Sequence, residues 1–357
     1  MSASVSSPKK NGDLKILHFV ESYGGGVATA VQQYRTHKSL STSLLARVRK
    51  GDLNPADSPI SSSSFMTRSL IGLISKWLRI RNANFDIIHA HSTVAGLIAR
   101  LLPPKRGKVV YSPHAFIFKR PMNRLFRELS FYVEKILLSR TGSGVAVSLD
   151  EFNSFLDLGY SAKSIFVVPH YVKKIECVRL YPNEIIFVAI GRICFQKNPE
   201  AFVEFKANWE SKFSETPRWI WIGDGEKVTR EKLVSSGIEV TGWLPRAEVT
   251  ALLGDATILF HPARYEGLPM AIIEAMSHGV PVVASDIAPH AEIEGVITYK
   301  DIDDAAQLAH QLLDYQMWPK QSSVVSSSID KHFSQRQQEL ALSKAYLACF
   351  PGIDRNE

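Results

Sequence analysis

The sequence predicts an α/β protein made of two Rossmann-like domains, each with a parallel sheet. Three observations lead to this fold class. The chain has 357 residues, which is more than one typical hydrophobic core accommodates. Short apolar runs that indicate buried strands alternate with helical segments, and this order is typical of a doubly wound parallel sheet. A stretch without strong periodicity at 173–183 separates two such series, and we expect the interdomain linker there.

Composition places the chain among ordinary globular proteins. Hydrophobic residues make up 45% of it and charged residues 22%, and no apolar run approaches the roughly 20 residues that a membrane-spanning helix needs. Residues 1–12 lack the apolar segment of a secretory signal, so we expect a disordered leader and a cytoplasmic protein. Cys177, Cys194 and Cys349 form no metal-binding spacing and indicate a reducing compartment.

Charge is distributed unevenly between the two halves. Residues 1–180 carry 26 Lys and Arg against 11 Asp and Glu, whereas residues 181–357 carry 16 against 24. A basic half suits an anionic membrane surface, an anionic lipid-linked substrate or a nucleic acid. The alternative is that scattered basic side chains only keep the domain soluble. We expect no nucleic-acid partner, because the sequence has no aromatic-interleaved basic repeat and no known nucleic-acid motif.

The first half opens with a strand at 14–20, the glycines Gly24, Gly25 and Gly26, and a helix from Val27. Glycines between a strand and a helix let the backbone approach a phosphate closely, but they are equally typical of a plain tight turn. They do not form the dinucleotide fingerprint, which needs a Gly-x-Gly-x-x-Gly spacing. The elements expected next are an exposed loop at 51–64, a helix at 67–81, a strand at 85–90, a helix at 94–102, and strands at 108–111, 144–148 and 165–169, with a helix at 150–158 before the last.

Residues 119–140 predict a basic amphipathic helix. Apolar side chains recur there at helical spacing, and Lys and Arg side chains accompany them. Such a helix can pack on the sheet with a solvated basic face, lie on an anionic membrane, or do both.

Three histidines lie in or just after predicted strands. His89 lies within a strand, so we expect it in the core. His91 lies at the end of the same strand, where it either packs or lines a cleft. His114 follows the next strand, at the sheet edge where open α/β sheets bind ligands. His89 and His91 are far along the chain from any cysteine or third histidine, so we expect no metal site.

The second half restarts with a strand at 184–190 and a loop that carries Arg192 and Lys197 to the start of a helix. Two cations near the free N–H groups of a helix start suit a diphosphate. A strand at 218–222 then leads to a glycine turn at Gly223. Helices are expected at 303–317 and 334–349.

The most informative stretch is 261–281. It follows an apolar strand at 256–260 and continues as a loop, a helix from Pro269 to about His278, and a strand at 280–285. Glu266 lies in the loop at the carboxyl edge of the strand, and Glu274 lies in the helix. The N–H groups of Gly267 and Leu268 are placed to bind an anion. The plainer alternative is a surface loop with two solvated carboxylates.

The pattern EGLP-x4-E-A-x3-G-x-P-V-V-A, together with GR-x4-KN at 191–198, resembles the retaining nucleotide-sugar glycosyltransferases of the GT-B fold, the GT4 family. The resemblance covers about residues 13–350. It implies an acceptor domain at 13–172 and a donor domain at 184–330, with their sheets facing across a cleft. It also implies a last helix, at 331–350, that crosses back to the N-terminal domain.

The resemblance also implies roles for single residues. Glu266 and His114 would contact the transferred sugar, and Glu274 would bind the ribose hydroxyls, since carboxylates accept paired hydroxyl hydrogen bonds well. Arg192 and Lys197 would stabilise the departing diphosphate in place of a metal. Gly24, Gly25 and Gly26 would reach towards the donor, and Gly223 would lie near the nucleotide base. Asp301-Ile302-Asp303 has the letters of a metal motif, but its position predicts a helix cap.

We therefore expect a metal-independent, retaining glycosyltransferase that uses a UDP-sugar or GDP-sugar and needs no cofactor. The expected acceptor is a glycan, lipid-linked, in the assembly of a cell-surface polysaccharide such as lipopolysaccharide or capsule. The 119–140 helix would hold the enzyme on the inner face of the cytoplasmic membrane. Two alternatives remain open from the residues alone: a sugar-nucleotide epimerase of the same fold, and a non-catalytic binding protein that uses the basic half.

Overall fold

The computed structural model describes residues 14–37, 40–48, 64–173, 175 and 181–350. The expected leader, nearly all of the loop at 51–64, Cys177 and much of the expected linker lie outside these residues. The described chain forms two compact units. The first comprises the residues up to His170 together with those from Arg336 onward, and the second comprises Tyr171–Gln335.

The first unit has a seven-stranded sheet in the order β3-β2-β1-β4-β5-β6-β7, and every neighbouring pair is parallel. This order reverses between β1 and β4, as in a Rossmann sheet. The strands are β1 (Lys15–Val20), β2 (Ser41–Arg47), β3 (Ser64–Thr67), β4 (Ile87–His91), β5 (Lys108–Ser112), β6 (Ser143–Ala146) and β7 (Ile165–Val167).

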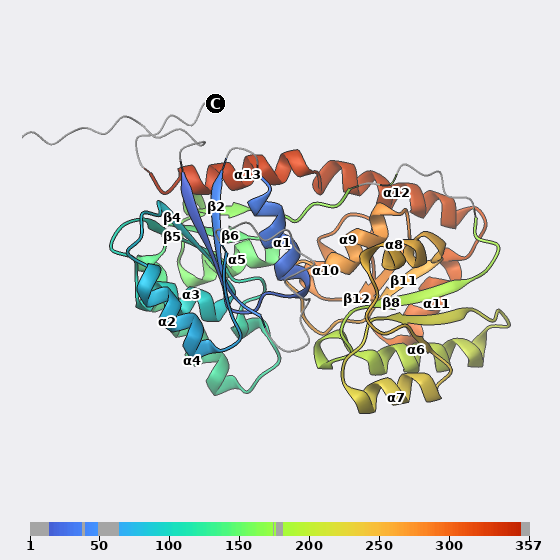
Figure 1. Cartoon of the computed structure of the whole chain (residues 1–357). Helices are drawn as coiled ribbons and strands as arrows, with labels where there is room; N and C mark the ends of the chain where they lie inside the picture. Colours follow the sequence, from blue (N-terminus) through green and yellow to red (C-terminus); the bar gives the residue numbers. More distant parts are fainter. Residues whose placement is uncertain (1–13, 38–39, 49–63, 174, 176–180, 351–357) are drawn as a thin grey trace, which may run out of the picture. The chain divides into compact units, whose positions relative to one another are not determined.

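Helices cover both faces of this sheet (Figure 1). They are α1 (Gly25–Arg35), α2 (Leu70–Ile80), α3 (Thr93–Leu101), α4 (Arg124–Ile136), α5 (Leu149–Leu158) and α13 (Gln335–Leu347). One core packs α2, α3 and α5 on the sheet, with Trp77, Tyr111 and Phe155 fully buried in it. The core on the other face is closed by α1 and α13, which contribute Tyr34 and Tyr346.

The second unit repeats this plan with six parallel strands in the order β10-β9-β8-β11-β12-β13. The strands are β8 (Ile186–Ile190), β9 (Arg218–Ile222), β10 (Glu239–Val240), β11 (Ile258–His261), β12 (Val282–Ser285) and β13 (Ile297–Tyr299). The helices are α6 (Pro199–Lys212), α7 (Lys227–Ser235), α8 (Arg246–Asp255), α9 (Met270–Ser277), α10 (Ala288–Ala291), α11 (Ile302–Leu312) and α12 (Met317–His332). The prediction of two parallel-sheet α/β units is therefore confirmed.

Several local predictions were wrong. The helix expected from residue 67 begins at Leu70, because the residues before it form β3 and the Ser69 side chain caps the helix by accepting from the Gly72 N–H. Strand β2 was not predicted. The helix expected at 303–317 ends at Leu312, and the separate helix α12 follows it.

Helix α4 turns a charged residue into the core and its apolar side chains outward. Glu134 is buried and bonds both the Arg100 guanidinium, at 2.8 Å, and the Tyr111 hydroxyl, at 2.9 Å. The exposed large apolar side chains of α4 are Leu125, Phe126, Leu129, Tyr132 and Ile136. Most of the predicted apolar stripe therefore does not pack on the sheet. In the described part of the chain, no helix is both long and apolar enough to cross a membrane.

Candidate active site

Two loops of the second unit meet at the point where its strand order reverses. One loop follows β8 and the other follows β11, and these strands are neighbours in the sheet. Open α/β sheets bind ligands at such a switch point. The Arg264 N–H donates to the Gln196 carbonyl at 2.8 Å, and the Arg264 guanidinium donates to the Asn198 side chain at 2.6 Å. The two loops are thereby held together, as a site built from both requires.

Glu266 and Lys197 form an ion pair at the centre of these loops. The Lys197 Nζ lies 2.5 Å from the Glu266 Oε1, and both side chains are largely buried. Gln196 Nε2 donates to the other carboxylate oxygen at 3.3 Å and to the Tyr265 carbonyl at 3.0 Å. The His261 Nε2 lies 3.5 Å from Glu266 Oε1. The carboxylate is therefore held from three sides.

These neighbours decide the charge of Glu266. Burial alone would raise the pKa of its carboxyl, but the Lys197 ammonium and His261 outweigh burial and bring the pKa to about 2. The pKa of His261 is lowered by burial and by the charge of Lys197. Glu266 is thus an anion at every ordinary pH, and it accepts hydrogen bonds instead of donating a proton.

A close backbone approach shapes the loop that carries Lys197. Gly223 has φ +135°, and a Cβ on it would lie 2.3 Å from the Gly191 carbonyl oxygen. That oxygen also accepts the Trp221 indole N–H at 2.9 Å. Only glycine fits at 223, because any side chain would displace the start of the loop. The structure thus gives Gly223 a packing role beside the loop. Its expected place near a nucleotide base stays a prediction.

Glu274 lines a hollow of about 650 Å³ on the second unit, together with Lys173 and Arg246. The Arg246 guanidinium lies 3.7 Å from its carboxylate. Burial raises the pKa of Glu274, while the charges of Arg246 and Lys197 lower it. Lys197 therefore acts electrostatically on both predicted carboxylates.

Three other predicted residues of this unit lie in the same two loops. Arg192 is exposed in the loop after β8. Gly267 and Leu268 are buried just before α9, and neither N–H donates to a protein group among the described residues. Asp301 caps α11 by accepting from the Asp304 N–H at 2.9 Å, so the prediction of a cap is confirmed.

His114 lies in a strained turn of the first unit. Its φ is 50° and that of Ala115 is 81°, a left-handed backbone that costs non-glycine residues roughly 1–3 kcal/mol each. The buried Glu151 carboxylate holds the turn by accepting the N–H groups of Ala115 and Val147. The His114 Nε2 lies 3.0 Å from the His91 Nδ1, and burial lowers the pKa of His114 to about 4.

His89 is buried, as predicted, and bonds the Tyr346 hydroxyl and the Ser112 hydroxyl, each at 2.8 Å. His91 is also fully buried, so it packs and does not line a surface. A third histidine, His18, comes from β1 and lies beside both. Separation along the chain was therefore the wrong criterion for excluding a histidine cluster.

The glycine turn after β1 is the start of a helix. Helix α1 begins at Gly25, not at Val27, and Gly25 has φ +54° with nothing within 4 Å of an added Cβ. Gly24 is the N-cap residue, with extended backbone. Gly25 and Gly26 are exposed, so solvent reaches the backbone of this turn.

Sequence reasoning missed the side chains that hold the predicted ones in place. Gln196 and Arg246 are among them in the second unit, and His18 and Glu151 in the first. Only Gln196 carried a signal, because it precedes Lys197 in the same loop.

Two family models match the chain. Glycosyltransferase Family 4 matches residues 37–173, and Glycosyl transferases group 1 matches residues 184–315. An uncharacterized 41.2 kDa protein in the cps region of Klebsiella pneumoniae is 26% identical over 303 residues, covering 78% of this chain and 83% of that one. The UDP-Gal:alpha-D-GlcNAc-diphosphoundecaprenol alpha-1,3-galactosyltransferase of Escherichia coli is 24% identical over 62% of this chain and 63% of its own.

Among solved structures, Anabaena Alr3699/HepE in complex with UDP and glucose superposes with a TM-score of 0.73 at 16% identity. The match covers 93% of this chain and 98% of that one. The fold is therefore shared along nearly the whole length of both chains.

Proposed function

Because the chain belongs to glycosyltransferase family 4, we propose that it transfers a sugar from a UDP-sugar or GDP-sugar to a lipid-linked glycan acceptor. Transfer retains the configuration at the anomeric carbon and needs no metal. The observation that carries the proposal is the position of Lys197, which pairs with Glu266 in the neighbouring loop and acts electrostatically on Glu274 in α9. Two similar proteins support the substrate classes: Anabaena Alr3699/HepE binds UDP and glucose, and the Escherichia coli galactosyltransferase uses UDP-Gal and a diphosphoundecaprenol-linked acceptor. Another relative, the Vi polysaccharide biosynthesis protein VipC/TviE of Salmonella typhi, supports a place in polysaccharide assembly.

In this reaction the bond between the anomeric carbon and the diphosphate oxygen breaks, and a bond to an acceptor oxygen forms. The departing diphosphate gains negative charge, which Arg192, Lys197 and the N–H groups of Gly267 and Leu268 would stabilise. Glu266 is ionised down to a pH of about 2, so it accepts hydrogen bonds from sugar hydroxyls. Glu274 accepts those of the ribose. In the first unit, we expect His114 to contact the transferred sugar and the turn at Gly24, Gly25 and Gly26 to contact the donor.

Replacement of the two cations tests the diphosphate role. Arg192→Ala and Lys197→Ala should each lower donor turnover by about 10²–10³, the usual loss when a group that stabilises developing charge is removed. Lys206→Ala is a matched control, because that lysine is about as buried as Lys197 and pairs with Glu210 within α6. A loss of less than tenfold in both site variants would contradict the role.

Three further measurements test the rest of the proposal. Transfer should persist in excess EDTA, and NMR of the product should show the anomeric configuration of the donor. A loss of activity in EDTA overturns metal independence, and an inverted product overturns retention. A new sugar-nucleotide isomer formed without acceptor would point to an epimerase instead.

Helix α4 supports a membrane-facing acceptor. Its exposed apolar side chains lie among Arg124, Arg127 and Lys135, a combination that binds anionic bilayers. The protein should float with anionic liposomes at low salt, and Leu125→Glu with Ile136→Glu should abolish flotation. Val228→Glu replaces an equally exposed apolar side chain on α7 and should leave flotation intact. A protein that stays unbound at low salt would rule out this part.

A further inference from the structure

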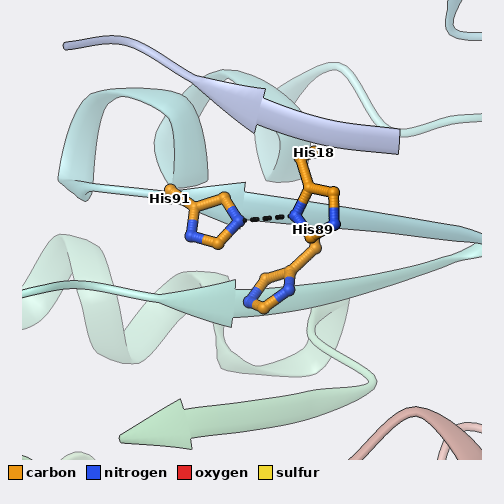
Figure 2. Close-up of side chains that lie close together, drawn as sticks. All are labelled: His18, His89 and His91. Atoms are coloured by element: carbon orange, nitrogen blue, oxygen red, sulfur yellow. Dashed lines mark hydrogen bonds between the residues drawn. The ribbon is translucent and has the colours of Figure 1, made fainter. Parts of the chain in front are cut away.

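A line of three hydrogen-bonded imidazoles in the first unit ends at His114. The His18 Nδ1 lies 3.0 Å from the His91 Nε2, and the His91 Nδ1 lies 3.0 Å from the His114 Nε2. Figure 2 shows the first of these contacts, with His18 and His91 on neighbouring strands. His18 and His91 are fully buried, and His114 is partly exposed. The line therefore runs from the core to the surface.

All three imidazoles are neutral at pH 7. Burial lowers the pKa of His18 to about 3 and that of His114 to about 4. Burial and the neighbouring histidines hold the pKa of His91 well below its usual range. A neutral imidazole has one N–H and one lone pair. His91 must therefore donate to one neighbour and accept from the other, and the whole line donates either towards His114 or away from it.

The inner end of the line favours one direction. The His18 Nε2 is buried, and no protein group among the described residues bonds to it. A buried N–H without an acceptor is rarer than a buried acceptor without a donor. The His18 proton therefore belongs on Nδ1, and donation runs through His91 to His114.

We infer that His18 and His91 are positioning residues that hold His114 in the tautomer with its proton on Nδ1. Among the described residues, the His114 Nδ1 bonds to no protein group. It is also not among the buried polar atoms without a partner, so solvent reaches it. It is therefore accessible, and its N–H donates to an oxygen atom of the ligand. The identity of that ligand as the transferred sugar rests on the proposed function, whereas the tautomer does not.

An alternative role for His18 and His91 is to bind a metal ion together with His89. His18, His89 and His91 each offer a nitrogen within 4.8 Å of the others, and three histidines hold zinc in other proteins. Both nitrogens of His89 already bond hydroxyl groups, however, and both nitrogens of His91 bond imidazoles. A shared ion would have to break bonds that the structure makes.

Histidine-selective ¹⁵N labelling of the full chain tests the tautomer directly. Long-range ¹H–¹⁵N NMR at pH 7 reports which ring nitrogen carries the proton, and the His114→Gln variant assigns the His114 signals. We expect the proton of His114 on Nδ1 in the unaltered protein. Protonation mainly on Nε2 overturns the inference. One equivalent of zinc in the purified protein, measured by elemental analysis, also overturns it.

Variants of the inner histidine test the direction of donation. His18→Leu removes the donor, so the His114 signals should shift to a mixture of tautomers, and His18→Asn should restore the single one. His89→Gln is the matched control, because it replaces an equally buried histidine outside the line and should leave His114 unchanged. Unchanged His114 signals in His18→Leu overturn the inference.

Activity separates this inference from the proposed function. If His114 donates to the sugar, kcat/KM should fall about tenfold in His18→Leu, the usual effect of one lost hydrogen bond, and recover in His18→Asn. If His18→Leu shows the expected mixture of His114 tautomers but keeps its kcat/KM, the positioning role is supported, and His114 does not bind the sugar.

Discussion

The ion pair between Lys197 and Glu266 leads to a quantitative prediction. The pKa of Glu266 is about 2 instead of 4.5 although burial opposes this. At 1.36 kcal/mol for each pH unit, the difference corresponds to about 3 kcal/mol of stabilisation of the ionised form. Lys197→Met should therefore lower the free energy of unfolding of the second unit by about 3 kcal/mol at pH 7. In a double-mutant cycle with Glu266→Gln, the coupling should be of the same size, since the two side chains act as one unit.

The pH dependence follows from the direction of the shift. A carboxyl whose pKa is lowered by folding contributes stability that is fully present above its unfolded pKa, near 4.5, and is lost as the pH falls towards its folded pKa of about 2. In Lys197→Met the burial of Glu266 raises its pKa with less charge to oppose it. The difference in stability between the unaltered protein and Lys197→Met should therefore be largest near pH 7 and shrink as the pH falls towards 2.

Urea unfolding followed by tryptophan fluorescence measures this difference, because four buried tryptophans report on the second unit: Trp209, Trp219, Trp221 and Trp318. Lys227→Met is the matched control. That lysine lies 3.8 Å from Glu231 in an exposed pair on α7, and such pairs contribute less than about 0.5 kcal/mol. A coupling below about 1 kcal/mol at pH 7, or one that stays the same at pH 3.5, would refute the reasoning.

Three other perturbations have expected outcomes. Gly223→Ala forces a Cβ against the Gly191 carbonyl and should lower the free energy of unfolding in urea by about 2 kcal/mol or more. Gly254→Ala is the control and should cost no stability, because a Cβ added there meets nothing within 4 Å. Equal effects of the two variants would contradict the close approach. Glu134→Gln leaves the buried Arg100 guanidinium without its charged partner and should lower the free energy of thermal unfolding by about 3–5 kcal/mol. Glu128→Gln, on the exposed side of α4, should change this free energy little. A UDP-sugar or GDP-sugar at about 100 times its Kd should stabilise the protein by about 2.7 kcal/mol; a thermal-shift screen in which no nucleotide sugar raises the melting temperature would argue against the donor.

The strands with the strongest apolar character were predictable from the sequence. Strand β9 matches its predicted bounds, and β11 lies within two residues of them. Strands buried on both faces of a parallel sheet are continuous apolar runs, so their signal is local. The loops with Arg192, Lys197 and Glu266 were likewise visible, because charged side chains directly after such strands stand out.

The missed elements lacked that local signal. Strand β3 has four residues at the sheet edge, where no apolar run is required. Helix α12 contains the run SSVVSSS, and serine is a weak helix former. Its Ser322 and Ser328 are buried where α12 packs against α9, so tertiary packing decides its conformation. The relation of His18 to His91 depends on the register of β1 against β4, which no local pattern specifies.

The first unit is built from two separate segments of the chain, and this has a consequence for biosynthesis. Helix α13 closes the core over Tyr34 and bonds His89 through Tyr346, yet the ribosome makes it after all 165 residues of the second unit, Tyr171–Gln335. At about 5–20 residues per second, that interval is on the order of 10–30 s. During it the nascent first unit exposes the sheet face that carries the histidine line. The nascent chain therefore offers chaperones an apolar surface that the finished protein no longer has.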